Sequence, residues 1–268
     1  MAERFRAETR AAIAAVEAGL AVVLSRQDAE DVRFKGPRDM VTGTDVAAQA
    51  AIERVLRAYD AAIAFVGEEG DPATVPDARR YWLVDPLCGT SNFAAELPFF
   101  AVNVALVEDD KVTIGVVADG TTGEVHVAER GGGAFLLGGE QLKVNPKARP
   151  VSLDPILPGP ARLSRFGTEL AIRVLADARY GVRILATTLS LIYLARGRMA
   201  AAVYVCSGLP VHFAAGLLIA EEAGAIVTDE RGEPWQLFGP IYIAAANPEV
   251  HRFLQRTAQE TVAAITGD

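Results

Sequence analysis

The sequence predicts an α/β protein whose N-terminal half is of the α+β type, and three observations lead to this class. Between residues 3 and 26, apolar side chains such as Ile13, Val16 and Leu20 recur at helical spacing. Between 99 and 136, runs of alternating apolar residues are separated by turn signals, which predicts antiparallel strands. After residue 160, strand and helix patterns alternate, as is typical of an α/β unit.

The N-terminal half is expected to contain two helices, several short strands and two breaks. Gly36 and Pro37 lie in a turn-rich break over 33–39, and prolines mark a loop over 71–77. Helical spacing and alternation define the remaining elements. Helices are predicted at 3–26 and 46–59, and strands at 62–66, 81–84, 102–106, 112–116, 124–128 and 133–137.

The best candidate for a domain boundary is 146–160, a stretch rich in proline and without periodicity. We therefore expect two halves, an α+β half over 1–148 and an α/β half over 149–268. In the second half, helices are predicted at 168–178, 188–197, 212–224 and 248–264, and strands at 182–185, 201–205, 225–228 and 241–245.

Composition bounds the class of protein. The 268 residues are 51% hydrophobic and 22% charged, the balance of a globular chain with a full core. The 26 basic and 34 acidic residues give a net charge of −8 without a basic cluster, so no nucleic-acid partner is expected. Two cysteines are too few for a disulfide framework. Because neither a signal peptide nor an apolar run of membrane-spanning length is present, we expect a cytoplasmic protein that does not enter a membrane.

Three acidic residues lie where strands end or helices begin, namely Asp45, Glu68 and Asp85. Asp85 opens the segment Asp-Pro-Leu-Cys-Gly-Thr-Ser-Asn-Phe, in which Gly89 permits a tight turn. A helix is expected to follow this turn. The backbone N–H groups at such a helix start are suited to bind an anion.

Several short motifs follow one another in order along the chain. They occupy 39–45, 67–69, 85–93, 128–131, 214–216, 221–224 and 246–248. In this order they resemble the inositol monophosphatase superfamily over almost the whole chain. The resemblance implies a layered α-β-α-β-α sandwich, usually a homodimer. It also implies a Mg²⁺-dependent, lithium-sensitive phosphatase of small phosphorylated polyols.

The resemblance also assigns roles to individual residues. Glu68, Asp85 and the main-chain carbonyl of Leu87 match the residues that hold the first metal ion. Asp45 and Thr90 match those that orient the attacking water. The amides of Gly89 and Thr90 match the phosphate-binding amides, and we expect Ser91 beside them to contribute to substrate binding.

Two metal-binding aspartates of the family are replaced in this chain, one by Cys88 and one by His212. In the family, both acids share the second metal ion with the residue matching Asp85. Mg²⁺ prefers oxygen ligands, so the loss of two carboxylates is expected to abolish this second Mg²⁺ site. Val205 and Val211 replace an acidic residue and a tryptophan of the family, and we expect both valines to line the substrate pocket.

Ligands of one metal ion lie roughly 3 Å apart, so Cys88 and His212 are expected side by side. Our leading hypothesis makes Cys88 a nucleophile, His212 its general base and Asp85 the group that orients the imidazole. Amides at the helix start would lower the thiol pKa. The expected reaction is acyl transfer, hydrolysis or cyclisation of a small molecule in a biosynthetic pathway, with no cofactor required.

Three alternatives remain open. The first is a Mg²⁺-dependent phosphomonoesterase with a degenerate metal site. The second is a Zn²⁺ or Fe²⁺ site made of Cys88, His212 and Asp85, with Glu68 as a further candidate ligand. The third is a non-catalytic protein that binds a phosphorylated metabolite through Gly89 and Thr90.

Overall fold

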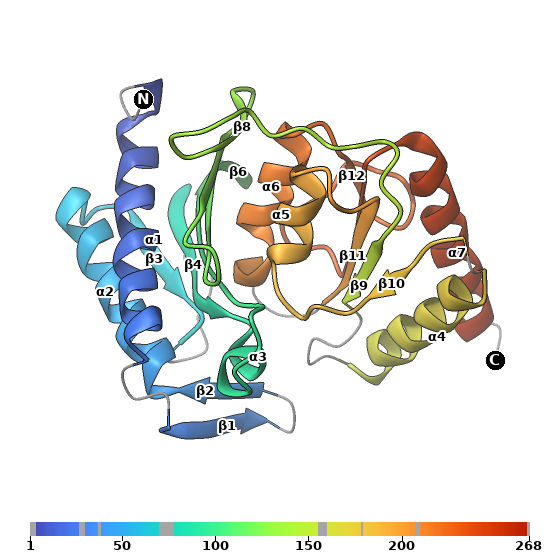
Figure 1. Ribbon diagram of the computed structural model, residues 1–268, viewed down its shortest axis with the longest axis horizontal. Coiled ribbons are helices and arrows are strands. Elements are labelled where there is room, and N and C mark those ends of the chain that lie inside the picture. Colours follow the sequence, from blue (N-terminus) through green and yellow to red (C-terminus); the bar gives the residue numbers. More distant parts are fainter. Residues whose placement is uncertain are drawn as a thin grey trace.

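The computed structural model describes residues 4–26, 30–36, 39–69, 78–154, 160–177, 179–206 and 210–266. Helices and sheets alternate in five layers (Figure 1). A helix pair, a six-stranded sheet, a second helix pair, a five-stranded sheet and a third helix pair follow one another across the molecule. The predicted α/β class and layered α-β-α-β-α sandwich are therefore confirmed.

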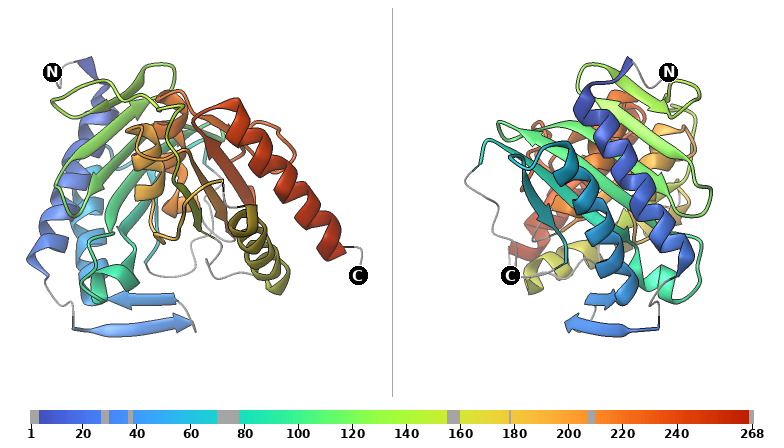
Figure 2. Two further views of the ribbon diagram at one scale, coloured as in Figure 1. Left: turned by 45° about the vertical axis from the view of Figure 1, so that its right-hand side comes forward. Right: turned by 90° about the vertical axis from the view of Figure 1, so that its left-hand side faces the viewer.

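The first outer layer consists of α1 (Ala7–Ser25) and α2 (Gly43–Tyr59), which cover one face of the six-stranded sheet (Figure 2). Each helix buries one apolar face, with Val16 and Ile52 fully enclosed. The two helices approach closely at Gly19, where a Cβ atom would lie 2.7 Å from Cδ1 of Ile52. A small residue at this position therefore sets the distance between the helices.

The six-stranded sheet has the order β3-β4-β5-β6-β7-β8. Its first pair is parallel and every later pair is antiparallel. Helices cover both faces, so the central strands are apolar almost throughout. The strands are β3 (Ala64–Gly67), β4 (Arg80–Cys88), β5 (Ala101–Glu108), β6 (Lys111–Asp119), β7 (Val125–Glu129) and β8 (Gly133–Leu136).

The central helix layer, α5 (Leu189–Ala195) and α6 (Ala214–Glu222), lies between the two sheets (Figure 1). Helix α6 is apolar on nearly all sides, as a helix enclosed between two layers must be. It reaches the first sheet at Gly115, where a Cβ atom would lie 2.6 Å from the carbonyl oxygen of Ala215. The chain segment that leads into α6 passes the end of β4, and the site forms at this place.

The second sheet has the order β10-β9-β11-β13-β12, with β10, β9 and β11 parallel and the remaining pairs antiparallel. Its outer face is covered by α4 (Ala161–Asp177) and α7 (Pro248–Thr266), which lie side by side (Figure 2). The strands are β9 (Val151–Asp154), β10 (Val182–Arg183), β11 (Ala201–Val205), β12 (Ile226–Thr228) and β13 (Ile241–Ala245).

Several elements differ from their predictions. The expected break over 33–39 holds parts of two paired strands, β1 (Val32–Gly36) and β2 (Asp39–Thr42). The first three residues of β1 are exposed, so they show no buried apolar pattern. Strand β9 lies within 146–160, the stretch predicted to be a boundary without periodicity. It is four residues long and therefore too short to show an alternating pattern. Helix α4 begins at Ala161 directly after a proline, seven residues before the predicted start. The predicted loop over 71–77 lies outside the described residues.

The two-domain division stays a prediction. The strands of the first sheet lie between residues 64 and 136, and those of the second between 151 and 245. However, α6 from the C-terminal half packs on β6 and β7 of the first sheet. Within the described ranges, no helix combines the length and apolar character needed to cross a membrane. Cytoplasmic location and homodimer formation also stay predictions.

Candidate active site

The end of strand β4 supplies the centre of the site. Its pairing with β5 is irregular between Asp85 and Cys88, which turns the strand out of the ladder. Gly89 follows with φ +101°, and a Cβ atom there would lie 2.6 Å from the carbonyl oxygen of Phe99. Only glycine fits this turn without strain. The chain then enters the short helix α3 (Thr90–Ala94).

Asp45 and Thr90 are joined by a hydrogen bond, with Thr90 Oγ1 2.9 Å from Asp45 Oδ1. The same hydroxyl lies 3.0 Å from the carbonyl oxygen of Leu87. Asp45 is fixed by a capping box at the start of α2, where its Oδ2 accepts from the Thr42 N–H at 2.8 Å. Burial raises the pKa of Asp45. The starts of α2 and α3 thus meet at the end of β4.

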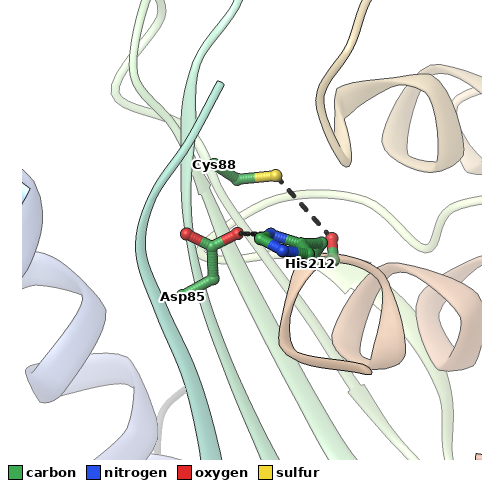
Figure 3. Close-up of side chains that lie close together, drawn as sticks. All are labelled: Asp85, Cys88 and His212. Carbon is green, nitrogen blue, oxygen red and sulfur yellow. Dashed lines mark hydrogen bonds and ion pairs between the residues drawn. The ribbon is translucent and has the colours of Figure 1, made fainter. Parts of the chain in front are cut away.

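His212 lies against two carboxylates. Its Nδ1 is 2.8 Å from Oδ2 of Asp85 and 3.8 Å from Oε2 of Glu68 (Figure 3 shows the contact with Asp85). Burial and the Asp85 carboxylate raise the pKa of Glu68 well above its usual range. Burial opposes a charge on His212, but the Glu68 carboxylate and the hydrogen bond to Asp85 outweigh it and raise the pKa of His212. The fully buried Asp85 and the partly exposed His212 therefore form an ion pair.

Cys88 is buried beside His212. Its Sγ lies 3.7 Å from the carbonyl oxygen of His212 and accepts the N–H of Thr188 at 3.3 Å. Burial and the Asp85 carboxylate raise the pKa of the Cys88 thiol to about 12. Cys88 also ends β4, ahead of Gly89 and outside the first turn of α3. The thiol is therefore protonated at neutral pH.

Asn103 is a site residue that the sequence did not single out. It pairs with Asp85 across β4 and β5, and its Nδ2 donates to the carbonyl oxygen of His212 at 3.1 Å. This bond holds the 3₁₀ turn η2 (Pro210–His212) against the sheet. A signal was present, since Asn103 is a polar residue within the apolar run of β5.

The residues expected to bind substrate do not all come together. Gly89, Thr90 and Ser91 lie at the start of α3, where the first helical hydrogen bond runs from Phe93 N–H to the Gly89 carbonyl at 3.0 Å. The amides of Thr90 and Ser91 precede this bond, as N-terminal helix amides do. Val205 and Val211 are only 3% and 2% exposed and belong to different apolar clusters. Their role in lining a substrate pocket stays a prediction.

Comparison with known proteins decides the family. A profile of the inositol monophosphatase family matches residues 3–266. The chain belongs to the inositol monophosphatase family. It is 33% identical over 262 residues to the inositol-1-monophosphatase of Mesorhizobium japonicum, with 94% of this chain and 95% of that protein covered. It is 32% identical over 234 residues to the fructose-1,6-bisphosphatase/inositol-1-monophosphatase of Thermotoga maritima, with 87% of each covered.

The solved structures agree with this assignment. The Thermotoga maritima IMPase superposes with a TM-score of 0.80 at 28% identity, covering 94% of this chain and 96% of that one. The family match supports an enzyme of the phosphatase type. It gives no support to a transferase or cyclase.

The leading hypothesis of a Cys88–His212 nucleophile and base is wrong. The relatives from Mesorhizobium japonicum and Thermotoga maritima are named as phosphatases, which fits the Mg²⁺-dependent alternative better. The site gives the physical reason. Because burial and the Asp85 carboxylate raise the pKa of Cys88 to about 12, little thiolate is present at neutral pH, although the contact between Asp85 and the Nδ1 of His212 is the one expected.

The expectation that no cofactor is required is also wrong, since the family to which the chain belongs consists of Mg²⁺-dependent phosphatases. The physical reason again lies in the site. The carboxylates of the fully buried Asp85 and of the largely buried Glu68, whose side chain is 17% exposed, both lie within 4.0 Å of Nδ1 of His212. Such a concentration of negative charge favours a bound cation.

Proposed function

We propose that this IMPase-family protein is a Mg²⁺-dependent phosphomonoesterase that releases inorganic phosphate from a small phosphorylated molecule, a polyol phosphate being the first candidate. The observation that carries this proposal is the hydrogen bond of 2.9 Å between Thr90 and Asp45. It places a hydroxyl and a carboxylate in contact beside the Leu87 carbonyl and close to Asp85. This arrangement is suited to activate a water molecule next to a cation.

The first metal position fits Mg²⁺. Glu68 and Asp85 offer carboxylate oxygens and Leu87 offers a main-chain carbonyl, and hard oxygen donors are the ligands that Mg²⁺ prefers. Burial of both acids beside each other supports the same conclusion, because a divalent cation offsets their repulsion. A Mg²⁺ ion bound there supplies stabilisation of the negative charge that builds up on the phosphoryl oxygens.

Thr90 and Asp45 would activate the water. The Thr90 hydroxyl donates to Asp45, so its free lone pair accepts a hydrogen bond from water and orients the water oxygen towards phosphorus. As the oxygen–phosphorus bond forms, one water proton passes to Thr90 and the Thr90 proton passes to Asp45. The raised pKa of Asp45 favours this uptake. The phosphorus–oxygen ester bond breaks, the leaving oxygen takes a proton from bulk water to give the alcohol, and Asp45 returns its proton to the solvent as inorganic phosphate is released.

The second metal position of the family does not fit Mg²⁺. Asp85 offers oxygen there, but Cys88 offers sulfur and His212 offers nitrogen. No step of the reaction is therefore assigned to a second Mg²⁺ ion.

Phosphate release from a panel of small phosphomonoesters, with and without Mg²⁺, tests the proposal. Thr90→Val keeps the shape of the side chain but removes the hydroxyl, and it should lower kcat by about 100-fold or more. Thr90→Ser keeps the hydroxyl and should retain most of the activity. Asp45→Asn should behave like Thr90→Val, whereas Glu53→Gln on the exposed side of α2 should have no effect.

Two outcomes would overturn the proposal. One is the absence of Mg²⁺-dependent phosphate release across the panel, in which case substrate binding without turnover would favour a non-catalytic binder. The other is full activity of Thr90→Val.

A further inference from the structure

Three side chains of different chemistry converge at the end of β4. Asp85 and Cys88 come from β4, and His212 comes from η2 (Figure 3). One carboxylate oxygen, the Sγ atom and one imidazole nitrogen all lie within 4.8 Å of one another. Asp85 and Cys88 are buried, while the His212 side chain is 29% exposed. The cluster is thus enclosed on the protein side and accessible on one side.

This set of donors selects the type of metal ion. Mg²⁺ takes oxygen ligands in octahedral geometry, and a thiolate and an imidazole are poor ligands for it. Sulfur, nitrogen and carboxylate donors together are typical of Zn²⁺, which is bound by three protein ligands and an open fourth position in catalytic sites. Soft and borderline donors also accept Fe²⁺ or Co²⁺.

The distances allow such an ion after a small adjustment. Ligand bonds to tetrahedral Zn²⁺ of about 2.0–2.3 Å place the donor atoms roughly 3.3–3.8 Å apart. The Asp85–His212 pair is closer than this, at 2.8 Å, because a hydrogen bond joins it. A metal ion that replaces the shared proton would move the two atoms apart by about half an ångström. The thiol needs to move inward by no more than about 1 Å.

The surroundings hold each donor in position. The Leu87 N–H donates to Asp85 Oδ1 at 3.1 Å, which leaves Oδ2 to face the cluster. The Thr188 N–H donates to Cys88 Sγ at 3.3 Å, a contact that stabilises a thiolate. Asn103 holds the main chain of His212 at 3.1 Å. Such outer-shell hydrogen bonds are what orient metal ligands in proteins.

We propose that Asp85, Cys88 and His212 form a binding site for a thiophilic divalent transition-metal ion, with Zn²⁺ as the first candidate, in place of the second Mg²⁺ ion of the family. The chain thus combines an oxygen-lined position for Mg²⁺ with a neighbouring mixed-donor position, and Asp85 borders both. The inference concerns binding and holds independently of the phosphatase proposal.

Metal binding to the full-length chain tests the inference. Chelator-stripped protein is titrated with Zn²⁺ in competition with a chromophoric chelator, and with Co²⁺ under an absorption spectrometer. We expect one equivalent of Zn²⁺ and a thiolate-to-cobalt charge-transfer band. Cys88→Ser should remove the band and weaken Zn²⁺ binding by more than the roughly 10–100-fold that outer-shell substitutions cause. Excess Mg²⁺ should not displace the Zn²⁺ ion.

Cys206→Ser is the matched control, because Cys206 is the other buried cysteine and lies outside the cluster. It should retain both the band and the affinity. Should Cys88→Ser fail to fold, Cys206→Ser still decides the question, since the chain has 2 cysteines and Cys88 is then the one remaining source of thiolate.

The inference is overturned if wild-type protein binds no Zn²⁺ equivalent, if the Co²⁺ complex shows no charge-transfer band, or if Cys88→Ser binds Zn²⁺ as tightly as wild type. Failure of phosphate release leaves these binding readouts unchanged, so the two proposals fail separately. The double substitution of Cys88→Asp and His212→Asp restores an all-oxygen donor set. It should lower the affinity for Zn²⁺ relative to Mg²⁺.

Discussion

His212 and Asp85 form an ion pair of 2.8 Å that joins η2 to strand β4 across 127 positions of sequence. Asp85 is completely buried, and Glu68 is the second acid within reach of the same imidazole. His212 lies within reach of both carboxylates and offsets their negative charge. It therefore stabilises the acids that meet at the end of β4.

Replacing His212 with asparagine is expected to destabilise the protein by about 3–5 kcal/mol in the absence of metal, because it leaves buried acids without a positive partner. Urea unfolding measures the loss. Millimolar Mg²⁺ should restore part of the stability, since an ion bound by Glu68 and Asp85 favours the folded state. The double variant with Glu68→Gln should be less destabilised than the sum of the single variants. If the two losses in the free energy of unfolding simply added, His212 would not compensate the charge of Glu68.

The turn at Gly89 gives a second prediction. Gly89→Ala combines a φ of +101° with a Cβ atom 2.6 Å from the Phe99 carbonyl oxygen, and the backbone must shift to relieve that contact. We expect a loss of about 2–3 kcal/mol in the free energy of unfolding and a marked loss of phosphate release, because Thr90 follows directly.

Gly123→Ala is the control for backbone strain alone. Its φ is +72°, but a Cβ atom there has nothing within 4 Å. This variant should lose about 1 kcal/mol and keep its activity. Equal losses in the two variants would contradict the importance of the close contact with Phe99.

Local patterns predict the α/β class and most of its elements, whereas the layered arrangement and the roles of the acidic residues follow from the resemblance to the inositol monophosphatase family. The strand that ends at Asp85 and the glycine that follows it are visible as an apolar run and a turn signal. The protonation state of the Cys88 thiol cannot be predicted from such a local pattern. Its thiol is governed by burial, by Asp85 and by the Thr188 N–H, 100 positions away in the sequence. Desolvation outweighs the expected effect of a nearby helix start.

Asn103 was missed for a similar reason. A polar residue within the apolar run of β5 is a signal, but it does not reveal the partner, because Asn103 bonds to the main chain of His212, 109 positions away. The pairing of β1 and β2 was missed because the first three residues of β1 are exposed. Helix periodicity identified α1, α2 and α7, in which one face is buried and the other is exposed.

Asn103→Ala tests whether this residue positions His212. Loss of the bond at 3.1 Å should cost about 1–3 kcal/mol of stability and weaken Zn²⁺ binding by about 10–100-fold, because η2 is then free to move. Asn92→Ala is the matched control. Asn92 donates to two main-chain carbonyls, of Phe99 and Leu185, neither of which belongs to the metal cluster. It should lose stability while Zn²⁺ affinity is retained, and a parallel loss of affinity would indicate a general effect on the fold.

Two buried groups away from the metal cluster give opposite dependences of stability on pH. Burial raises the pKa of Asp154 to about 6, so the folded protein binds this proton more tightly than the unfolded chain. Stability is therefore lost as the pH rises from about 4 to 6, by about 3 kcal/mol in total. Burial and the Arg196 guanidinium lower the pKa of His126 to about 4. Stability is then lost as the pH falls from about 6.5 to 4, by a similar amount.

Substitution separates the two effects. Asp154→Asn keeps an acceptor for the Ala186 N–H and offers a donor to the hydroxyls of Ser152 and Ser190. It should be more stable than wild type by up to about 3 kcal/mol at pH 7.5, with the difference shrinking towards pH 4.5. His126→Gln should instead lose less stability than wild type over the same fall in pH. Urea unfolding at pH 4.5, 5.5, 6.5 and 7.5 measures both variants. A constant difference between Asp154→Asn and wild type across this range would show that Asp154 does not titrate there, because a raised carboxyl pKa requires the difference to grow with pH.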